Sequence, residues 1–298
     1  MEKLSIGIDL GCTHIKAILV KEDGTVLKEH REDTQEHNDL HWKNAVARII
    51  KEFKSGSQIN AIGLSAPGLA NATNTCIEFM PGRLPGLENF NWSDFTGERI
   101  YVLNDAHAAL MAEAKFGVAK TLKHVVMLTL GTGVGGGILI DGKLYQGVGQ
   151  MAGHLGHVTV HAEGLVKDVT NMPGSLEDAI GNLTVKERTK GKFETTWDLV
   201  KAYEAKDSFA TEVWLSSIRK LAASIASFIN VLSPELVIIG GGISKAEELL
   251  LKPLNEYLSQ FEWRPGGKQT PIRLAHFSDL AGALGAAGFA LSKINQKL

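Results

Sequence analysis

The sequence predicts an α/β protein built from two similar halves. Near its start, an alternating strand at residues 4–10 leads into the turn Gly11-Cys12-Thr13 and then into a second strand. In the middle, the apolar run at residues 125–130 leads into a glycine-rich loop and then into a second apolar run at residues 138–140. Further strands and helices are predicted after each pair, and a chain of 298 residues is long enough for two domains of about 100–200 residues each.

The first half reads as a strand meander followed by alternating helices and strands. Its predicted elements are strands at residues 4–10, 15–20 and around Val26, a helix at 40–53, strands at 61–65 and 101–103, and a helix at 106–116. The helix at 40–53 is indicated by a stripe of apolar residues at helical spacing. A long connection rich in Asn, Pro and Gly runs from Ala66 to Trp92, and its amides and aromatic ring would suit a sugar-binding wall, whereas ordinary solvated turns are the alternative.

The second half continues with a hairpin at Asp141-Gly142 and then becomes mostly helical. Its predicted elements are a short helix opened by residues 174–177, a polar surface excursion at 182–193, helices at 197–203 and 212–232, a buried strand at 235–239, a helix from Ala246 and a small-residue helix start at 279–287. The helix at 212–232 is strongly apolar, so we expect it to be deeply packed or part of a subunit interface. The small residues at 279–287 would allow close approach of an adenine ring or of another helix.

The composition favours a small-molecule partner. The chain is 44% hydrophobic and 21% charged with a formal charge of −2, which provides no basic footprint for nucleic acid and no polybasic patch for a membrane surface. Cys12 and Cys76 form no C-x-x-C pair, so neither a disulfide framework nor a cysteine-rich zinc site is expected and a reducing cytoplasm fits. We predict no signal peptide, because the N-terminus is acidic early and has no small-residue cleavage site, and no transmembrane segment, because no window of about 20 residues is uninterruptedly apolar.

Two glycine turns are candidate phosphate sites. In the loop at residues 131–137, five glycines in seven residues could adopt positive φ and present several backbone N–H groups to an anion, with the Thr132 hydroxyl as a further donor. A glycine-rich hairpin without a ligand is the alternative. The loop is neither a Walker loop nor a dinucleotide fingerprint, because no Gly-Lys-Ser/Thr and no helix follow it. In the first turn, Asp9 could hold a phosphate-bound Mg²⁺ beside Thr13, or it could simply cap an ordinary hairpin.

Asn104 and Asp105 follow a predicted strand and open a helix. In open α/β sheets ligands bind at the carboxyl ends of the strands, so this pair lies where a site is expected. Asp105 could accept the proton of an attacking hydroxyl as a catalytic base. A helix N-cap is the alternative role for the same residue.

Histidines are concentrated after the central loop. A metal site formed by His154, His157, His161 and Asp168 is one interpretation, but no thiolate and no convincing ligand spacing support it. Hydrogen bonding to substrate hydroxyls is the simpler role for these imidazoles.

Five motifs in order make the chain resemble the ROK family of sugar kinases, over essentially its whole length. The motifs are Asp9-Leu10-Gly11-Cys12-Thr13, Leu103-Asn104-Asp105-Ala106-His107-Ala108-Ala109, Leu130-Gly131-Thr132-Gly133-Val134-Gly135-Gly136-Gly137, Gly153-His154-Leu155-Gly156-His157 and Ile239-Gly240-Gly241-Gly242. The resemblance implies a two-domain actin-like ATPase fold of the ribonuclease H-like type, with a cleft between the domains. It also implies an ATP-dependent hexose or amino-sugar kinase that uses Mg²⁺, works in the cytoplasm and forms a homodimer. We expect residues 1–115 with about 284–298 to form the N-terminal domain and residues 116–283 to form the C-terminal one.

The same resemblance implies the roles of individual residues. Asp105 would be the catalytic base. The sugar would be bound by Gly68, Asn89, Asn104, Asp105, His154, His157 and Glu177. ATP would be bound by Asp9, Gly11, Cys12, Thr13, Lys16, Thr132, Gly133, Gly241 and Gly242, with Asp9 next to the Mg²⁺.

The chain departs from the family pattern at two places. The family's zinc motif C-x-C-G-x-x-G-C-x-E aligns with residues 168–177, where all three cysteines are replaced, so no structural zinc is expected. The family's E-x-G-H, whose Glu contacts the sugar, reads His154-Leu155-Gly156-His157 here. An acceptor-only carboxylate has thereby become a group that can donate a hydrogen bond, which bears on the choice of sugar.

Two other functions remain open at this point. A sugar-binding or regulatory protein could keep the fold without catalysis, but related repressors carry an additional N-terminal DNA-binding segment, for which the early first strand leaves no room. A kinase of another acceptor, such as a carboxylate, would keep the same ATP-binding half.

Overall fold

The computed structural model describes residues 2–163 and 171–295. Its contacts divide the chain into two compact units. Unit 1 comprises Met1–Thr121, Gln146–Ala152 and His276–Leu298, and unit 2 comprises Leu122–Tyr145 and Gly153–Ala275. Each unit is described by itself below, and the domain limits expected from the sequence stay a prediction.

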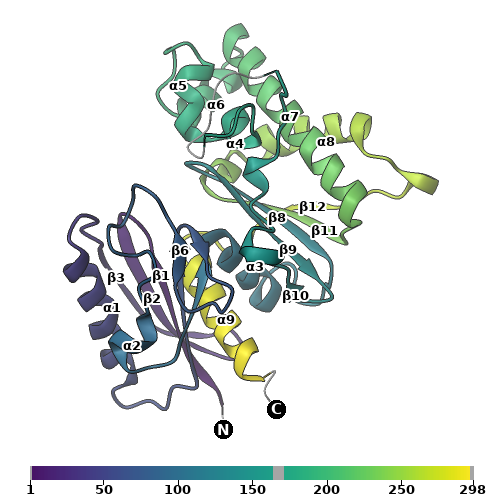
Figure 1. Ribbon diagram of the computed structural model, residues 1–298. Helices are drawn as coiled ribbons and strands as arrows, with labels where there is room; N and C mark the ends of the chain where they lie inside the picture. The colour runs from purple at the N-terminus through teal and green to yellow at the C-terminus, as the bar shows by residue number, and fades with distance from the viewer. Residues whose placement is uncertain (1, 164–170, 296–298) are drawn as a thin grey trace. The chain divides into compact units, whose positions relative to one another are not determined.

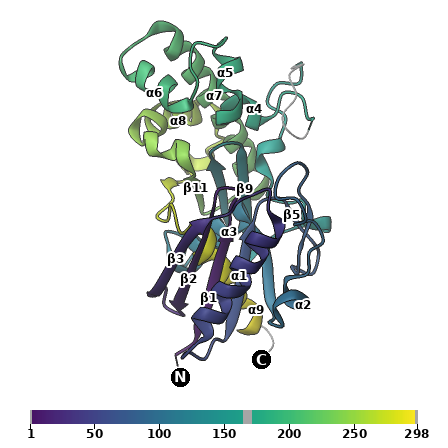
Figure 2. The same ribbon diagram turned by 90° about the vertical axis from the view of Figure 1, so that its left-hand side faces the viewer.

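Unit 1 is organised around a five-stranded sheet of order β3-β2-β1-β4-β7. The strands are β1 (Leu4–Leu10), β2 (His14–Lys21), β3 (Val26–Asp33), β4 (Ala61–Ala66) and β7 (Ile100–Asn104). The first three form the predicted antiparallel meander, and β4 and β7 extend the sheet in parallel to β1. In Figure 2 these first three strands lie side by side, with a helix across their face. The carboxyl ends of β1, β4 and β7 therefore share one edge of the sheet.

Helices cover both faces of this sheet, as Figure 1 shows. On one face lies α1 (Asp39–Lys54), whose apolar stripe is buried as predicted, and on the other lies α9 (Ala281–Asn295), next to α3 (Asp105–Phe116). The small residues of α9 allow backbone contact: a Cβ on Gly7 would clash with the carbonyl oxygen of Ala283, and one on Gly63 with that of Ala286. The helix at the C-terminal end thus packs directly on the sheet.

The long connection at residues 66–92 is more ordered than a run of solvated turns. It contains the hairpin of β5 (Leu69–Ala70) and β6 (Ile77–Phe79) and ends at α2 (Trp92–Thr96). Trp92 is completely buried, with its ring 4.8 Å from that of Phe90 and 5.8 Å from that of Trp42. This tryptophan therefore belongs to the core and offers no wall to a sugar.

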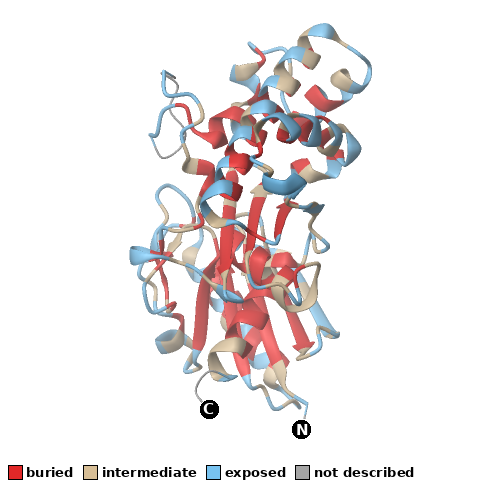
Figure 3. Ribbon diagram, turned by 90° about the vertical axis from the view of Figure 1, so that its right-hand side faces the viewer, coloured by how far each residue is buried: buried red, intermediate tan, exposed pale blue. Residues whose placement is uncertain are grey.

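Unit 2 repeats the sheet topology of unit 1. Its order is β10-β9-β8-β11-β12, from β8 (Val125–Leu130), β9 (Val134–Ile140), β10 (Lys143–Leu144), β11 (Leu236–Gly240) and β12 (Ile272–Leu274). The first three strands in sequence are antiparallel, and β11 pairs in parallel with β8. The two similar halves expected from the sequence are thus two sheets of one topology. Buried residues fill the strands of both sheets in Figure 3.

The core of unit 2 lies between its sheet and the helices α6 (Thr196–Glu204), α7 (Ser208–Leu232) and α8 (Glu248–Phe261). The expected apolar helix, α7, buries one stripe that includes Trp214, Leu221 and Ile225. Among the described residues it is the one helix long and apolar enough to cross a membrane, and 44% of its most apolar window is buried in the unit. A core helix of a globular protein has the same composition.

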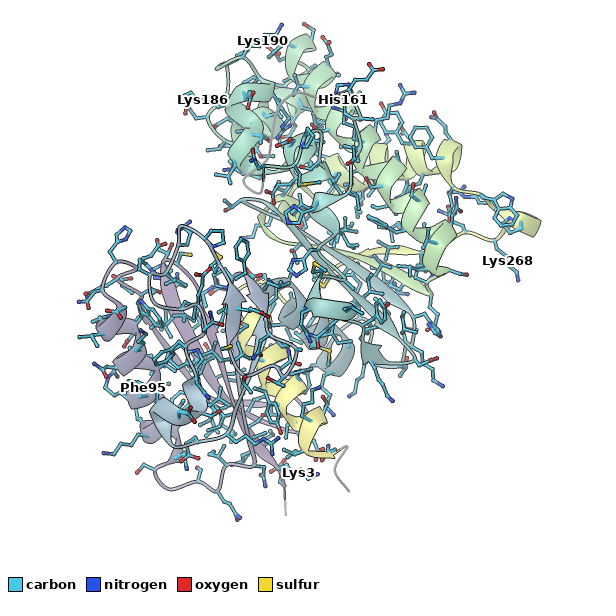
Figure 4. All side chains as sticks on the ribbon, in the orientation of Figure 1. Lys3, Phe95, His161, Lys186, Lys190 and Lys268 are labelled. Atoms are coloured by element: carbon cyan, nitrogen blue, oxygen red, sulfur yellow. The ribbon has the colours of Figure 1, made fainter. Side chains whose placement is uncertain are left out.

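The polar stretch at residues 182–193 lies mostly at the surface of unit 2, as its composition predicted. It forms η3 (Asn182–Thr184) and α5 (Val185–Arg188), directly after α4 (Leu176–Ile180). Val185 and Thr189 are fully buried, whereas the labelled Lys186 and Lys190 point outward in Figure 4. The lysines that dominate its composition therefore mark only one side of the segment.

Candidate active site

The predicted site residues are divided between the two units. Unit 1 carries Asp9, Gly11, Cys12, Thr13, Lys16, Gly68, Asn89, Asn104 and Asp105, and unit 2 carries Thr132, Gly133, His154, His157, Glu177, Gly241 and Gly242. Each group is described within its own unit.

The turn Gly11-Cys12-Thr13 connects β1 to β2 and is fixed by its backbone and by one hydroxyl. The Gly11 N–H donates to the carbonyl of His14 at 3.1 Å. The buried Thr34 hydroxyl donates to the carbonyl of Gly11 at 2.6 Å, and the Thr34 N–H donates to that of Thr13 at 3.0 Å. Cys12 is half-buried, and burial raises the pKa of its thiol. Thr34, which the sequence did not single out, is therefore the side chain that holds this turn.

Asp9 lies in β1, one residue before its end. Its carboxylate accepts a hydrogen bond from the Ser65 hydroxyl at 2.6 Å, and a Cβ on Gly282 of α9 would clash with it. Burial raises the pKa of Asp9, while the Ser65 hydrogen bond and the positive charge of Lys16 act in the opposite direction. The Lys16 ammonium itself pairs with Asp279 at 2.6 Å. Asp9 is thus a partly desolvated carboxylate that a cation would stabilise.

Asn104 and Asp105 lie at the junction of β7 and α3, and Asn104 is the N-cap residue of α3. Its Oδ1 accepts the N–H groups of Ala106 and His107 at 2.9 and 3.2 Å, and its Nδ2 donates to the carbonyl of Gly68 at 2.9 Å. The capping role considered for Asp105 is therefore filled by its neighbour. Because both ends of the buried Asn104 amide bind backbone, its primary contribution in this structure is to fix the junction.

Asp105 is the first residue of α3, and its Oδ1 accepts the Ala106 N–H at 2.8 Å. The side chain has access to solvent. The protein atoms around it nevertheless disfavour its charged form, as does the nearby Asp9 carboxylate, and together they raise the pKa of Asp105 to about 6. A carboxylate with this pKa is ionised at neutral pH and is a stronger base than an ordinary aspartate.

Gly68 and Asn89 lie in the connection between β4 and β7. Gly68 has φ of 98°, and a Cβ there would come within 2.6 Å of the Phe79 carbonyl oxygen, so the position favours glycine. Asn89 is exposed, also with positive φ, and its N–H donates to the carbonyl of Ile77 at 2.7 Å. The contact of Gly68 with the Asn104 amide links this connection to the α3 junction.

The central glycine turn is shorter than expected. β9 already begins at Val134, and Gly135, Gly136 and Gly137 pair with β8, so only residues 131–133 form the turn. None of these five glycines has positive φ, contrary to the conformation that the sequence suggested. Close packing explains two of them: a Cβ on Gly133 would clash with the Glu177 carboxylate, and one on Gly136 would lie 2.8 Å from the Gly153 carbonyl oxygen.

Glu177 braces the central turn from α4. Its Oε2 accepts the N–H of Val134 at 2.8 Å, and the side chain is almost fully buried. Two further backbone bonds join the segment after α4 to the turn: Asn182 N–H to the Gly131 carbonyl and Leu183 N–H to the Thr132 carbonyl, both 3.0 Å. The predicted sugar ligand Glu177 is thus brought together with the predicted phosphate turn within unit 2.

Arg188 holds the segment after α4 in place, and the sequence did not indicate a role for this residue. Its guanidinium donates to the Gly181 carbonyl at 2.9 Å, to the Ser217 hydroxyl of α7 at 2.8 Å and to the Thr184 hydroxyl at 3.1 Å. Burial lowers the pKa of Arg188 to about 10, and Asp178 opposes this shift. The isolated arginine between outward-facing lysines was the only signal in the sequence.

Of the two predicted histidines, His154 precedes the short helix η2 (Leu155–His157) and His157 ends it, and their rings stack with centroids 6.4 Å apart. A Cβ on Gly156 would clash with the Val134 carbonyl, so this helix packs on the start of β9. The Leu176 N–H donates to the Val158 carbonyl at 2.9 Å, which places the chain after His157 next to the start of α4. His157 and Glu177 therefore lie on adjoining segments.

Gly241 and Gly242 follow β11, and a pocket opens beside them. Gly241 has φ of 86°, and a Cβ there would clash with the Leu130 carbonyl. The pocket has a volume of about 220 Å³. It is lined by Gly131, Thr132, Asn182, Thr195, Thr196, Trp197, Val200, Gly242, Ile243 and Ala246. Thr132 and Gly242 were predicted to bind ATP, whereas Asn182 and Trp197 were missed, although Trp197 is an apolar residue outside the buried stripe of its helix.

The histidine cluster does not form a metal site in the described part of the chain. No group of three or more His, Cys, Asp or Glu side chains there is placed to hold a metal ion. Asp168, which belonged to that interpretation, lies outside the described residues, as do Val169 and Thr170 of the stretch aligned with the zinc motif. The expected absence of a structural zinc stays a prediction.

Comparison with known proteins places this arrangement in a family. The chain is 31% identical to a glucokinase of Thermotoga maritima, over 99% of both chains. Its structure resembles that of a ROK hexokinase from Thermus thermophilus, with a TM-score of 0.89, 27% identity and coverage of 99% and 100%. It also resembles a ROK family glucokinase from Streptomyces griseus in complex with glucose and AMPPNP, with a TM-score of 0.78, 26% identity and coverage of 97% and 99%. The sequence profile of the ROK family matches residues 5–293, so the chain belongs to the ROK family, within the actin-like ATPase fold.

Proposed function

We propose that this ROK-family sugar kinase transfers the γ-phosphoryl group of ATP to a hydroxyl of a hexose or amino sugar, with Asp105 as the catalytic base. The observation that carries the proposal is the α3 junction. Asn104 caps the helix, which leaves Asp105 free of that role, and the surroundings raise the pKa of Asp105 to about 6. In the reaction the Asp105 carboxylate accepts the proton of the attacking hydroxyl, the hydroxyl oxygen bonds to the γ-phosphorus, and ADP leaves.

The acceptor sugar would be bound by the polar groups that the sequence predicted for it. Asp105 would bind the reacting hydroxyl, and His154, His157 and Glu177 would hydrogen-bond the other hydroxyls, with Asn89 as a further polar contact. Asn104 and Gly68 would act through their mutual hydrogen bond, by holding Asp105 in place. The glucose in the Streptomyces griseus complex supports a sugar as the acceptor.

The phosphates of ATP would bind at the two glycine turns, at Gly11–Thr13 with Lys16 nearby and at Thr132–Gly133, and Gly241–Gly242 would lie by the nucleoside. Asp9 fits a Mg²⁺ ion, because Mg²⁺ binds one or two carboxylates and keeps waters and phosphate oxygens as its other ligands. The raised pKa of Asp9 also indicates a carboxylate short of positive charge. When bound, Mg²⁺ would neutralise charge on the phosphates.

The activity is tested by measuring ADP formation with ATP and Mg²⁺ over a panel of sugars. The panel contains glucose, mannose, fructose, allose, N-acetylglucosamine and N-acetylmannosamine, with a carboxylate acceptor such as acetate as a further arm and no zinc added. Turnover with one of the sugars is the expected result. Thermal stabilisation by a sugar without any turnover would instead support a binding or regulatory protein, and turnover with acetate alone would support a different acceptor class.

The protein is further proposed to be a cytoplasmic homodimer that associates through α7. A groove of about 810 Å³ runs along this helix, is mostly apolar in its lining, and includes Phe228, Val231 and Leu232. Val231 is 80% exposed, which is unusual for an apolar residue next to such a groove. Light scattering should give twice the chain mass for the wild type and a single mass for Val231→Glu.

A further inference from the structure

The pocket beside the central glycine turn has the character of a nucleoside site. Of the described residues that line it none is charged, although it borders the turn proposed to bind phosphates. Its volume of about 220 Å³ is below the roughly 300–1,000 Å³ of pockets that enclose a whole ligand, so it would hold one part of a larger molecule. A neutral aromatic group joined to phosphates matches both observations.

Trp197 supplies an aromatic surface at this pocket. It lies in the first turn of α6, lines the pocket and is 51% exposed, whereas its neighbours Leu199 and Val200 are buried in the core. The Lys201 ammonium lies 5.7 Å from the centre of the indole ring and supports the ring from its own helix. An exposed indole is suited to stacking on a planar ring.

Asn182 supplies a hydrogen-bond donor at the same pocket. Its Oδ1 accepts the N–H of Thr196 at 2.8 Å, which fixes the orientation of the amide. The Nδ2 group is then available to donate a hydrogen bond to a different partner. No residue in the described ranges accepts a hydrogen bond from this Nδ2. The backbone N–H of Asn182 is bound to Gly131, so the side chain is held at a constant distance from the glycine turn.

We infer that Trp197 and Asn182 determine how the protein recognises the nucleoside of its phosphoryl donor. The indole of Trp197 stacks on the base, and the Asn182 amide donates a hydrogen bond to an acceptor atom of the nucleoside. The inference rests on the proposed function for the identity of the phosphoryl donor. It adds two residues that bind the nucleoside and thereby distinguish a nucleotide from an inorganic polyphosphate.

The test compares the binding of ADP and of inorganic tripolyphosphate by calorimetry, without sugar. Trp197→Ala should weaken ADP binding at least fivefold, the loss of a stacked base, and should change tripolyphosphate binding less than twofold. Trp197→Phe should restore most of the ADP affinity. Asn182→Asp, which keeps an acceptor for the Thr196 N–H but removes the donor, should weaken ADP binding by a similar factor. Trp263→Ala is the matched control, because Trp263 is 72% exposed and outside the pocket.

The outcomes separate this inference from the proposed function. An unchanged ADP affinity in Trp197→Ala overturns the inference, even if the enzyme phosphorylates a sugar, and so does an equal loss of ADP and tripolyphosphate binding. Selective loss of ADP binding supports the inference, even if no sugar in the panel is turned over. Failure of the wild type to bind ADP contradicts it.

Discussion

Two turns occupy the same place in two sheets of the same topology, and they are held in different ways. The turn after β1 is preceded by Asp9, and the turn after β8 by Thr129, each the last residue but one of its strand. In unit 1 the turn is fixed by the Thr34 hydroxyl and lies beside buried negative charge. In unit 2 the turn is fixed by Glu177 and by the backbone after α4.

The difference indicates how one topology serves two tasks. In unit 1 the strand ends carry Asp9 and Asp105, two carboxylates whose pKa values are raised, so under the proposed function this sheet would supply the groups for proton and metal chemistry. In unit 2 the strand ends carry uncharged groups and a neutral pocket, so under the proposed function this sheet would supply the surface for the nucleotide.

Replacing Arg188 should have the largest effect on the stability of unit 2. Arg188→Met leaves the Gly181 carbonyl and the Ser217 hydroxyl without their charged partner, and we expect the free energy of unfolding to fall by about 3 kcal/mol. Urea denaturation measures this. Arg273→Met, at an exposed arginine of β12, should change stability by less than about 0.5 kcal/mol. Equal effects of the two variants would contradict the bracing role.

A methyl group on Gly133 should disturb the turn of unit 2 that is proposed to bind phosphates, without unfolding the protein. In Gly133→Ala the new Cβ meets the Glu177 carboxylate, and a displacement of the turn by about 1 Å can cost roughly 10²-fold in kcat/KM for ATP. Gly131→Ala is the comparison in the same turn, because its new Cβ meets no protein atom within 4 Å and leaves the Glu177 contact intact. The comparison fails if both variants keep wild-type kinetics or lose activity equally.

The pH profile of kcat/KM should report the ionisation of Asp105 in unit 1. Because the pKa of Asp105 is raised to about 6, kcat/KM should fall about tenfold per pH unit below pH 6 and level off above it. The folded state also binds a proton more tightly than the unfolded state, so ionisation of Asp105 lowers stability as pH rises from about 4 to 6. Asp105→Asn should therefore melt at a higher temperature than the wild type at pH 7.5, with a smaller difference at pH 4. A pH-independent kcat/KM between 5 and 7 would argue against this base.

Loss of the Thr34 hydroxyl should have the smallest effect. Thr34→Val removes one hydrogen bond to the Gly11 carbonyl, worth about 1 kcal/mol, and should raise KM for ATP about two- to fivefold with little change in kcat. Steady-state kinetics with varied ATP measures it. Thr121→Val provides a control for the substitution, since Thr121 is exposed and its side chain makes no hydrogen bond among the described residues. A larger fall in kcat than rise in KM would show that this turn does more than bind phosphate.

Periodicity was sufficient for most of the fold. The stripe at residues 40–53 predicted α1, the alternation at residues 4–10 predicted β1, and the similar strand pairs anticipated two sheets. The surface position of the segment at 182–193 was predicted from its lysines, whereas the burial of Val185 and Thr189 depends on tertiary contacts that composition does not reveal.

The site was predictable only where a motif marks it. The Asn104-Asp105 pair was located by its position after a strand, but which of the two caps α3 depends on side-chain geometry. The glycines at 131–137 suggested a flexible loop, whereas the structure uses Gly133 and Gly136 to let Glu177 and Gly153 approach. Thr34 and Arg188 bind Gly11 and Ser217, which are distant in sequence, and Trp197 lines a pocket with distant residues, so no local pattern could point to them.

The most direct test of the account is turnover by Asp105→Asn beside its affinity for the sugar. The substitution keeps the size of the side chain but removes the base, so kcat should fall by roughly 10²- to 10⁴-fold while the Kd for the sugar, measured by calorimetry, stays within a few-fold of the wild type. That pair of results would establish Asp105 as the residue that takes the proton. Wild-type turnover in the variant would contradict the central claim, and so would a loss of sugar binding large enough to explain the loss of turnover.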